Sequence, residues 1–519
     1  MKKIALVNPP HPNKGCGYLL GAGYIASALK ASGREHLIFD EPCFSYLDGA
    51  TKLIAKIRDS RPDAIGFTLT SSSTVYWAYD FLKMLKDALP QTPVIAGGLH
   101  ATLLPAETLD AGFDFAVIGD GEETFIELLR RIEIGIPLDG LEGAAWRAQD
   151  GGLNIADAAY IKYLDSLPFP ANRFYLDRSG EKPRPYLTLI FSRGCFRTCS
   201  FCVERRLNRG VRFRSADNVM EEIADAWNRY GVNTLHFVDS SFLEDKKRVV
   251  ELCGRLIEFN QTTSFSWKCL ARADHLEPEL LSTMKRAGCD DIYIGMESAD
   301  AETLNKIRKN ISPEDNERAI ALCREAGIRP HGYLIVGFPW ENESHIAKSA
   351  DFRDRHKSDL DTLFFAPVPY PGTELYEEYH ERYGFTEWWR REKPGPMAAP
   401  GRPLHKWLRC FDPFLERNFF GYNAAEWSRV CSFLSSREIE TGGPGIKKSL
   451  YRLFLGILEK ISAALESVSP RAEHTLMPPA YRAFQSATNH FKKLSLSAAV
   501  GADSLPESWQ SGRAGTGFD

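Results

Sequence analysis

Several common sequence features are missing from this chain, and each absence narrows the classes of protein to which it can belong. The net charge is only −4 over 519 residues, so no excess of positive charge predicts nucleic acid as a partner. No apolar signal segment opens the chain, because Lys2 and Lys3 run directly into a short strand-like stretch. This predicts a reducing, cytoplasmic location, in which we expect no disulfides among the eleven cysteines.

Most of the cysteines are scattered, but three of them lie within eight residues: Cys195, Cys199 and Cys202. A strand-like run at 186–192 and the turn at 193–194 precede them. Three thiolates at this spacing suit an iron–sulfur cluster that keeps one iron open, the usual arrangement for a catalytic metal. A zinc knuckle and three buried thiols are the alternatives. A structural zinc site uses four ligands, however, and no fourth Cys or His lies close.

The first 145 residues alternate short apolar strands with amphipathic helices, which predicts a parallel doubly wound sheet. Strands are expected at 4–7, 36–39, 64–68, 93–96 and 115–118, and helices at 21–32, 50–60, 74–88, from 105, and at 122–132. Such sheets bind ligands at the carboxyl ends of their strands. The segments expected there are small or polar, at 8–11, 70–74, 97–100 and 119–124. Taken singly, a Gly-Gly pair or a serine run is equally consistent with a helix cap.

From residue 186 to about 371 strands and helices alternate again, which predicts a partial (β/α)6 barrel. The six strands are expected at 186–192, 234–238, 265–270, 292–296, 331–336 and 362–366. Barrel enzymes carry their chemistry at the carboxyl ends of the strands. The residues expected at those ends are Asp239, Arg272, Glu297, Ser298 and Gly337.

The cysteine spacing, with Phe201 just before Cys202, resembles the signature of the radical S-adenosylmethionine (SAM) superfamily. The resemblance implies a 4Fe-4S cluster on the three cysteines, with the fourth iron chelating SAM. It also implies that the later strand ends bind SAM. On chemical grounds Glu297 suits the ribose hydroxyls, Arg272 the methionine carboxylate and Asp239 the amino group. A barrel-rim ion pair is the alternative for each, and the family's usual Gly-Gly-Glu phrase is absent at 238–242.

The N-terminal domain, placed before such a motif, resembles the cobalamin-binding domain of cobalamin-dependent radical SAM enzymes. By this resemblance the cobalamin contacts are Ser71, Ser72, Gly97, Gly98, His100, Gly119 and Glu122. The Asp-x-His-x-x-Gly phrase that supplies a lower histidine ligand is absent around His11, so we expect no histidine on cobalt. The alternative is a flavodoxin-like domain that has lost its cofactor and only packs against the barrel.

The expected organisation is therefore a cobalamin-binding-like domain at 1–145, a linker at 146–180, the barrel at 181–375, an aromatic-rich helical region at 376–470 and a partly disordered tail at 471–519. The helical region either shapes the substrate cavity or forms an ordinary satellite core. The amphipathic stretch at 447–465 either packs on the protein or lies on a membrane surface.

The resemblance implies a methyltransferase that acts on an unactivated carbon through a 5'-deoxyadenosyl radical and methylcobalamin. Ring closure, oxidation or rearrangement with the same cofactors is the second hypothesis, and a non-catalytic cobalamin-responsive module is the third. Expected partners are a small-molecule or lipid substrate and an electron donor such as flavodoxin or ferredoxin.

Overall fold

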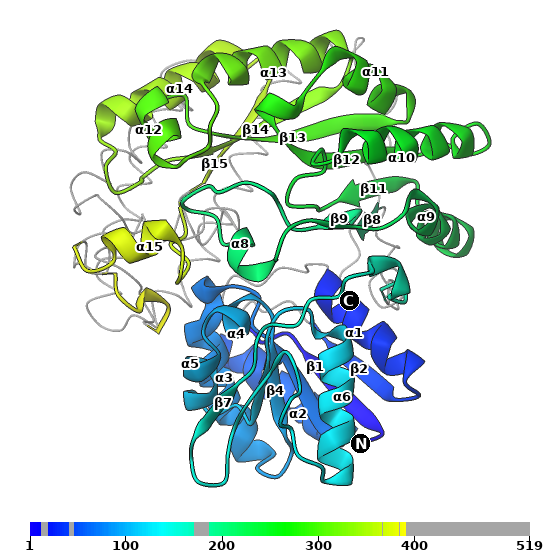
Figure 1. Ribbon diagram of the computed structural model, residues 1–519, viewed down its shortest axis with the longest axis vertical. Coiled ribbons are helices and arrows are strands. Elements are labelled where there is room, and N and C mark those ends of the chain that lie inside the picture. Colours follow the sequence, from blue (N-terminus) through cyan, green and yellow to red (C-terminus); the bar gives the residue numbers. More distant parts are fainter. Residues whose placement is uncertain (12–18, 41–45, 171–185, 366, 383–384, 391–519) are drawn as a thin grey trace, which may run out of the picture. The chain divides into compact units, whose positions relative to one another are not determined.

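The fold of the chain is described from a computed structural model, whose elements are labelled in Figure 1. The structure describes residues 1–11, 19–40, 46–170, 186–365, 367–382 and 385–390, all within one of the two units into which the chain divides. The amphipathic stretch at 447–465 and the tail predicted to be disordered lie outside these residues. In the part of the chain that is described, no helix is long and apolar enough to cross a bilayer.

The N-terminal third forms a seven-stranded sheet in the order β2-β1-β3-β4-β5-β6-β7. Its strands are β1 (Lys3–Val7), β2 (Glu35–Phe39), β3 (Ala64–Thr68), β4 (Val94–Gly97), β5 (Phe115–Val117), β6 (Ala144–Arg147) and β7 (Leu153–Ile155). The first five are parallel, which confirms the predicted doubly wound sheet. The strand order reverses between β1 and β3, so a ligand-binding crevice is expected at their carboxyl ends.

Strands β6 and β7 were not predicted, and they extend the sheet as an antiparallel edge hairpin. Their residues fall in the segment that the sequence assigns mostly to a linker. Each strand has only three or four residues, and no amphipathic helix separates the two, so they fall outside the strand–helix alternation that predicted the other strands.

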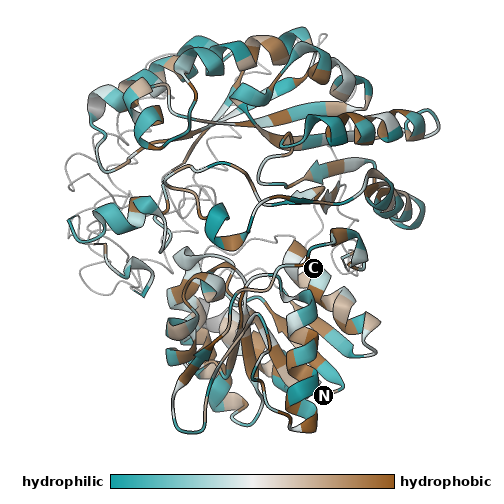
Figure 2. Cartoon of the chain, viewed as in Figure 1, coloured by the Kyte–Doolittle hydropathy of each residue, from teal (hydrophilic) through white to brown (hydrophobic). Residues whose placement is uncertain are grey.

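Helices cover both faces of this sheet. Helices α1 (Leu20–Ala31) and α6 (Gly121–Ile134) pack on one face. Helices α2 (Tyr46–Ser60), α3 (Val75–Ala88) and α5 (Pro105–Asp110) pack on the other. Figure 2 shows the resulting pattern, with hydrophobic strands inside and hydrophilic helix surfaces outside. The short helix α4 (Leu99–Leu103), which the sequence did not predict, follows the Gly97-Gly98 pair.

The second α/β domain has a six-stranded parallel sheet whose strands follow one another in chain order, as expected of a partial (β/α)6 barrel. Its strands are β8 (Tyr186–Leu189), β11 (Thr234–Phe237), β12 (Ser266–Arg272), β13 (Cys289–Glu297), β14 (Arg329–Ile335) and β15 (Asp361–Phe365). The intervening helices are α9 (Ala216–Tyr230), α10 (Lys246–Phe259), α11 (Pro278–Arg286), α12 (Ala301–Lys306), α13 (Pro313–Glu325) and α14 (Glu343–His356). All six predicted strands are present, and helices alternate with them as expected.

Local sequence explains several of these boundaries. Helix α13 begins with a capping box between Ser312 and Asp315, with Pro313 in its first turn. Helix α9 begins at the Ser215 cap, and Gly231 adopts the left-handed conformation that ends it. These caps satisfy backbone groups that the helix ends leave without partners.

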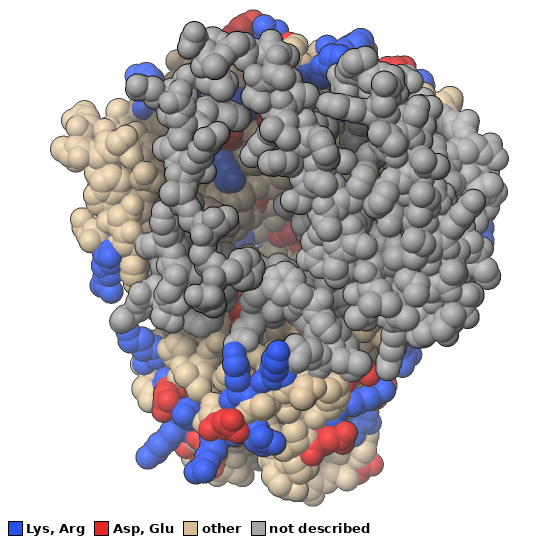
Figure 3. All heavy atoms as spheres, turned by 180° about the vertical axis from the view of Figure 1, so that it is seen from behind, with Lys and Arg blue, Asp and Glu red and all other residues tan. Residues whose placement is uncertain are grey.

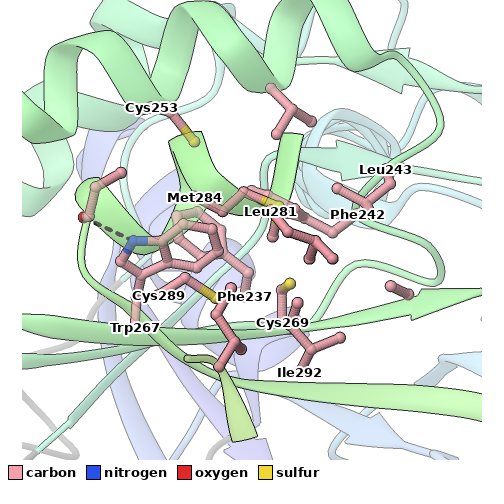
Figure 4. Close-up of a cluster of buried hydrophobic side chains, with 14 of the residues drawn as sticks. Phe237, Phe242, Leu243, Cys253, Trp267, Cys269, Leu281, Met284, Cys289 and Ile292 are labelled. Atoms are coloured by element: carbon pink, nitrogen blue, oxygen red, sulfur yellow. Dashed lines mark hydrogen bonds between the residues drawn. The ribbon is translucent and has the colours of Figure 1, made fainter. Parts of the chain in front are cut away.

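The barrel core lies between the sheet and its outer helices, and part of it is shown in Figure 4. Trp267 is fully buried there, and its indole N–H donates to the carbonyl of Ala287 at 2.9 Å. Cys253, Cys269 and Cys289 are free thiols within this apolar cluster. These three cysteines therefore act as small buried hydrophobic side chains.

An antiparallel pair, β9 (Ser192–Arg193) and β10 (Arg212–Phe213), brackets the cysteine-bearing loop and its short helix α8 (Glu204–Leu207). After the barrel come α15 (Glu374–Tyr379) and the 3-10 turn η4 (Trp388–Arg390). Trp388 and Trp389 are buried in a small apolar core with Val75 and Val336, so this part of the aromatic-rich region is a satellite core. On the face in Figure 3, the described basic and acidic side chains are intermixed.

Candidate active site

The three cysteines of the triplet lie on the loop that leaves the first barrel strand. Gly194 turns the chain into this loop with φ +102°, and a Cβ there would lie 2.0 Å from the carbonyl oxygen of Gly210. Only glycine fits this position. Within the loop the N–H of Cys202 donates to the carbonyl of Cys199 at 3.1 Å. All three thiols are free and none is fully buried, in contrast to the core cysteines.

The three sulfur atoms do not converge on a single point, because within the described residues no three Cys, His, Asp or Glu side chains could hold one metal ion. A cubane cluster does not require this, since each thiolate ligates a different iron. Burial raises the pKa of the Cys195 thiol to about 11, so a nearby cation is needed to keep it ionised at neutral pH. The arrangement of the sulfur atoms fits a cluster and not a lone zinc ion, whereas the raised pKa calls only for a bound cation.

Asp239, at the end of β11, is buried and holds the beginning of the cysteine loop. Its carboxylate accepts from the N–H of Phe191 at 3.1 Å, and from the N–H and hydroxyl of Ser192 at 2.5 and 2.6 Å. Burial raises the pKa of Asp239 to about 6. The oxygens of Asp239 therefore bind the residues that follow β8, and the contact of Asp239 with the amino group of SAM stays a prediction.

Arg272, the last residue of β12, also lies beside the cysteines. It binds Asp274 through Nε at 2.9 Å and through one Nη at 3.2 Å, and it donates to the carbonyl of Lys309 at 2.5 Å. Its other Nη points to the sulfur of Cys199 at 3.9 Å. Asp274 therefore already balances the charge of Arg272, whose predicted pairing with the carboxylate of SAM stays a prediction.

Glu297 ends β13 in an unusual conformation. Its φ is +62°, in the left-handed region that non-glycine residues seldom adopt, and the strand register shifts between Gly295 and Glu297. The buried ammonium group of Lys309 donates to Glu297 Oε1 at 2.7 Å. Backbone strain of this kind clusters at ligand sites and persists only where the surroundings enforce it.

Ser298 and Gly337 both form hydrogen bonds with residues a few positions further along the chain. The Ser298 hydroxyl is fully buried and accepts from the N–H of Asp300 at 3.1 Å. Gly337 has φ +99°, and its N–H donates to Glu341 at 2.6 Å. Burial raises the pKa of the Glu341 carboxyl to about 7. The predicted contacts of Ser298 and Gly337 with SAM stay predictions.

A cavity of about 540 Å³ opens at the carboxyl ends of β1, β3, β4 and β5, where the strand order predicts a crevice. Its deep part is apolar, with Leu6, Ile95 and Phe125 among the lining residues. Its mouth is polar and includes Asn8 and residues of the cysteine loop such as Glu204. No histidine is among the described residues that line it.

Glycines bring bare backbone to the wall of this cavity. Gly97, Gly98 and Gly119 all line it, and the Cβ position of Gly97 faces open space. A Cβ on Gly98 would lie 2.9 Å from the carbonyl oxygen of Leu69, and one on Gly119 would lie 2.3 Å from that of Ala159. Both have positive φ, at +103° and +87°. At Gly98 and Gly119 the protein's own backbone therefore requires glycine, whereas the open space beside Gly97 leaves room for a ligand to approach the main chain.

Glu122, near the start of α6, adds a polar group to the same wall. The residue is 5% exposed, and its Oε1 accepts from Arg193 at 2.6 Å. Its Oε2 is buried and has no hydrogen-bond partner among the described residues. Such an atom is costly unless a ligand donates to it. Cobalamin carries several amide side chains, so the apolar slot, the glycine wall and this oxygen fit that cofactor.

Ser71, Ser72 and His100 are not among the residues that line the cavity. His100 is fully buried; its Nδ1 lies 2.9 Å from the Ser72 hydroxyl and its Nε2 lies 3.1 Å from the Tyr79 hydroxyl. The Ser71 hydroxyl lies 3.2 Å from that of Tyr370. Ser72 and His100 therefore bind each other and Ser71 binds elsewhere, and the contact of all three residues with cobalamin stays a prediction.

Arg193 joins the cysteine loop to the wall of the cavity, a contact that sequence reasoning missed. It binds Asp120 at 2.8 Å and Glu122 at 2.6 Å, and its guanidinium lies 5.0 Å from the ring centre of Tyr24. Arg212 also binds Asp120. Burial alone would raise the pKa of Asp120, but the two arginines hold it below its usual value. Asp120 and Glu122 both lie in the polar segment 119–124 that the sequence analysis singled out. Nothing in the sequence, however, pairs Asp120 with Arg193, 73 positions further along the chain.

Two family models match the chain: the B12 binding domain over residues 13–129 and the radical SAM superfamily over residues 189–353. An uncharacterised methyltransferase of Pyrococcus horikoshii is 30% identical over 390 residues, which cover 72% of this chain and 82% of the relative. The chain belongs to the cobalamin-dependent radical SAM family. Its cofactors are therefore a 4Fe-4S cluster, SAM and cobalamin.

Other relatives of the family carry out different reactions. An anaerobic magnesium-protoporphyrin IX monomethyl ester cyclase of Cereibacter sphaeroides is 26% identical, over 75% of this chain and 66% of the relative. The structure of TsrM, a radical SAM methyltransferase of Kitasatospora setae with cobalamin and a 4Fe-4S cluster bound, matches with a TM-score of 0.60 at 20% identity. That match covers 74% of this chain and 76% of TsrM. The likeness to TsrM shows a shared fold.

Proposed function

We propose that this radical SAM enzyme is a methyltransferase that adds a methyl group to an unactivated carbon of a small molecule. The observation that carries the proposal is the cavity itself, because glycines of the first sheet and residues of the cysteine loop line it together. When bound, the cluster with SAM supplies a radical that abstracts hydrogen, and cobalamin supplies the methyl group.

The residues of the chain have defined tasks in this proposal. Cys195, Cys199 and Cys202 hold the cluster, Gly97 lets cobalamin approach the sheet, and Gly98 and Gly119 shape the wall beside it. The Glu297 carboxylate, kept in place by Lys309, accepts hydrogen bonds from the ribose of SAM. Its second oxygen has no contact that competes with this role among those described, since Lys309 binds Oε1.

The distinguishing experiment uses SAM labelled in its methyl group with the anaerobically reconstituted enzyme. We expect S-adenosylhomocysteine, 5'-deoxyadenosine and a product that carries the label. Ring closure, the reaction named for the Cereibacter relative, would give 5'-deoxyadenosine with no label in the product. Unlabelled product therefore overturns the methyl-transfer proposal while keeping the cluster chemistry.

Two single cysteine variants, one in the triplet and one in the core, test the role of the cluster. Cys199→Ala should abolish iron binding and every SAM product, because it removes one of three ligands. Cys253→Ala, in the buried core, should keep both. A non-catalytic cobalamin-responsive module would instead retain its cobalamin response in Cys199→Ala.

We further propose a low-potential flavodoxin or ferredoxin as the electron donor and a cytoplasmic location. A lipid substrate and membrane contact were predicted from the aromatic-rich region and the stretch at 447–465, most of which lies outside the described residues, and both stay predictions. Reduction of the cluster by purified flavodoxin, followed by its optical spectrum, tests the donor; a cluster that dithionite reduces but flavodoxin does not would exclude it.

A further inference from the structure

Two oppositely charged side chains contact the sulfur atoms of two different triplet cysteines. Glu244 Oε1 lies 3.6 Å from the Cys195 sulfur, and its other oxygen lies 3.4 Å from the N–H of Phe196. Arg272 Nη1 lies 3.9 Å from the Cys199 sulfur. Neither contact was predicted, since the sequence pointed to Arg272 as a SAM ligand or a barrel-rim ion pair and did not single out Glu244.

The two contacts respond differently when the thiols ionise to ligate iron. The contact at Glu244 depends on an S–H donor, so a Cys195 thiolate would face the carboxylate with no hydrogen between them. The contact at Arg272 has its donor on the guanidinium, so it becomes stronger when Cys199 carries a negative charge. The remaining contacts of Arg272, to Asp274 and to the carbonyl of Lys309, hold the guanidinium in place.

Reduction adds one electron to the cluster, supplied by an external low-potential donor. A nearby carboxylate disfavours that added negative charge, whereas a guanidinium that donates to a ligand sulfur favours it. Net charge and hydrogen bonds to the sulfurs are the terms by which a protein sets the potential of an iron–sulfur cluster. Both groups lie where electrostatic effects are stronger than in bulk water.

We propose that Glu244 and Arg272 are positioning residues that set the reduction potential of the cluster in opposite directions, Glu244 lowering it and Arg272 raising it. This rests on the cluster of the proposed function but not on methyl transfer. It assigns Arg272 a role at Cys199 that does not require contact with the carboxylate of SAM.

The test is a redox titration of the anaerobically reconstituted full chain without SAM, in which the reduced cluster is followed by electron paramagnetic resonance. At the wild-type midpoint we expect Glu244→Gln to raise the ratio of reduced to oxidised cluster about tenfold, and Arg272→Gln to lower it about tenfold. Glu244→Asp, which keeps the charge, should stay close to wild type. Glu277→Gln, which removes an exposed carboxylate paired with Lys246, should also leave the ratio unchanged.

Equal ratios in wild type and Glu244→Gln, at equal iron content, would overturn the proposal, as would shifts of the same sign in both glutamine variants. Should Arg272→Gln fail to bind iron, Arg272→Lys takes its place, and a ratio above wild type would contradict the assignment. A wild-type chain that binds no iron would instead refute the proposed function itself, so the two failures are distinguishable.

Discussion

The Arg193 contact offers a sharp test of how the cysteine loop is joined to the cavity wall. Arg193→Gln removes the guanidinium from between two carboxylates, with side-chain exposures of 16% for Arg193, 11% for Asp120 and 6% for Glu122. Asp120 keeps Arg212 as a partner, whereas Glu122 loses the only ion-pair partner found for it among the described residues.

The expected cost follows from the burial of this group. Removing one partner of a buried ion pair costs about 3–5 kcal/mol, because it leaves an uncompensated charge behind. Arg193 keeps some contact with water, so we expect about 3 kcal/mol of lost unfolding free energy. The matched control is Arg147→Gln, which breaks an exposed pair with Asp110 and should cost less than about 1 kcal/mol.

Urea unfolding at pH 7, followed by circular dichroism, measures both variants. A second substitution, Glu122→Gln, should restore part of the stability in the Arg193→Gln background, because it removes the orphaned charge. The reasoning is refuted if Arg193→Gln unfolds at the same urea concentration as Arg147→Gln.

The same contact predicts a dependence on pH. The arginines hold the pKa of Asp120 below its usual value of 3.8, so the stability that this carboxylate contributes is present above that value. It is lost as the pH falls through the lower pKa of the folded state. The difference between wild type and Arg193→Gln should therefore narrow below about pH 4. A difference that widens on acidification would contradict this assignment.

Two further variants test the remaining cofactor contacts. Gly119→Ala forces a Cβ against the backbone of Ala159 at the cavity wall, so we expect loss of bound cobalamin with iron content unchanged. The control Gly135→Ala, at a positive φ with open space around it, should keep the cobalamin. Equal cobalamin absorbance in the two variants would contradict the role of Gly119. Lys309→Met releases the Glu297 carboxylate, so we expect SAM to bind at least about tenfold more weakly by calorimetry. Lys306→Met, on the exposed side of α12, should bind SAM as wild type does, and identical affinities would refute the role of Lys309.

The arrangement of strands and helices could be predicted because it depends on local periodicity. Apolar runs such as 64–68 and 234–238 alternate with amphipathic helices, and these two runs match β3 and β11 to within one residue. The hairpin β6–β7 and the pair β9–β10 could not be predicted in this way, because they lie outside the alternation of strands with long amphipathic helices from which the other strands were predicted. Their pairing comes from the sheet edge or loop that they join.

In the candidate site, too, contiguous motifs could be predicted from the sequence and contacts between distant residues could not. The cysteine triplet is a contiguous motif, so its spacing alone indicated an iron–sulfur cluster, and the glycine-rich loops indicated a large ligand at the sheet edge. The partners of these motifs are distant in the chain: Arg193 with Glu122, Glu244 with Cys195, and Lys309 with Glu297. Periodicity describes neighbours along the chain, whereas an ion pair depends on which strand ends the folded sheets bring together. The amino-acid order was therefore enough to specify which cofactors to expect, whereas only the folded structure revealed which side chains distant in the chain contact the cysteine loop and the cavity wall.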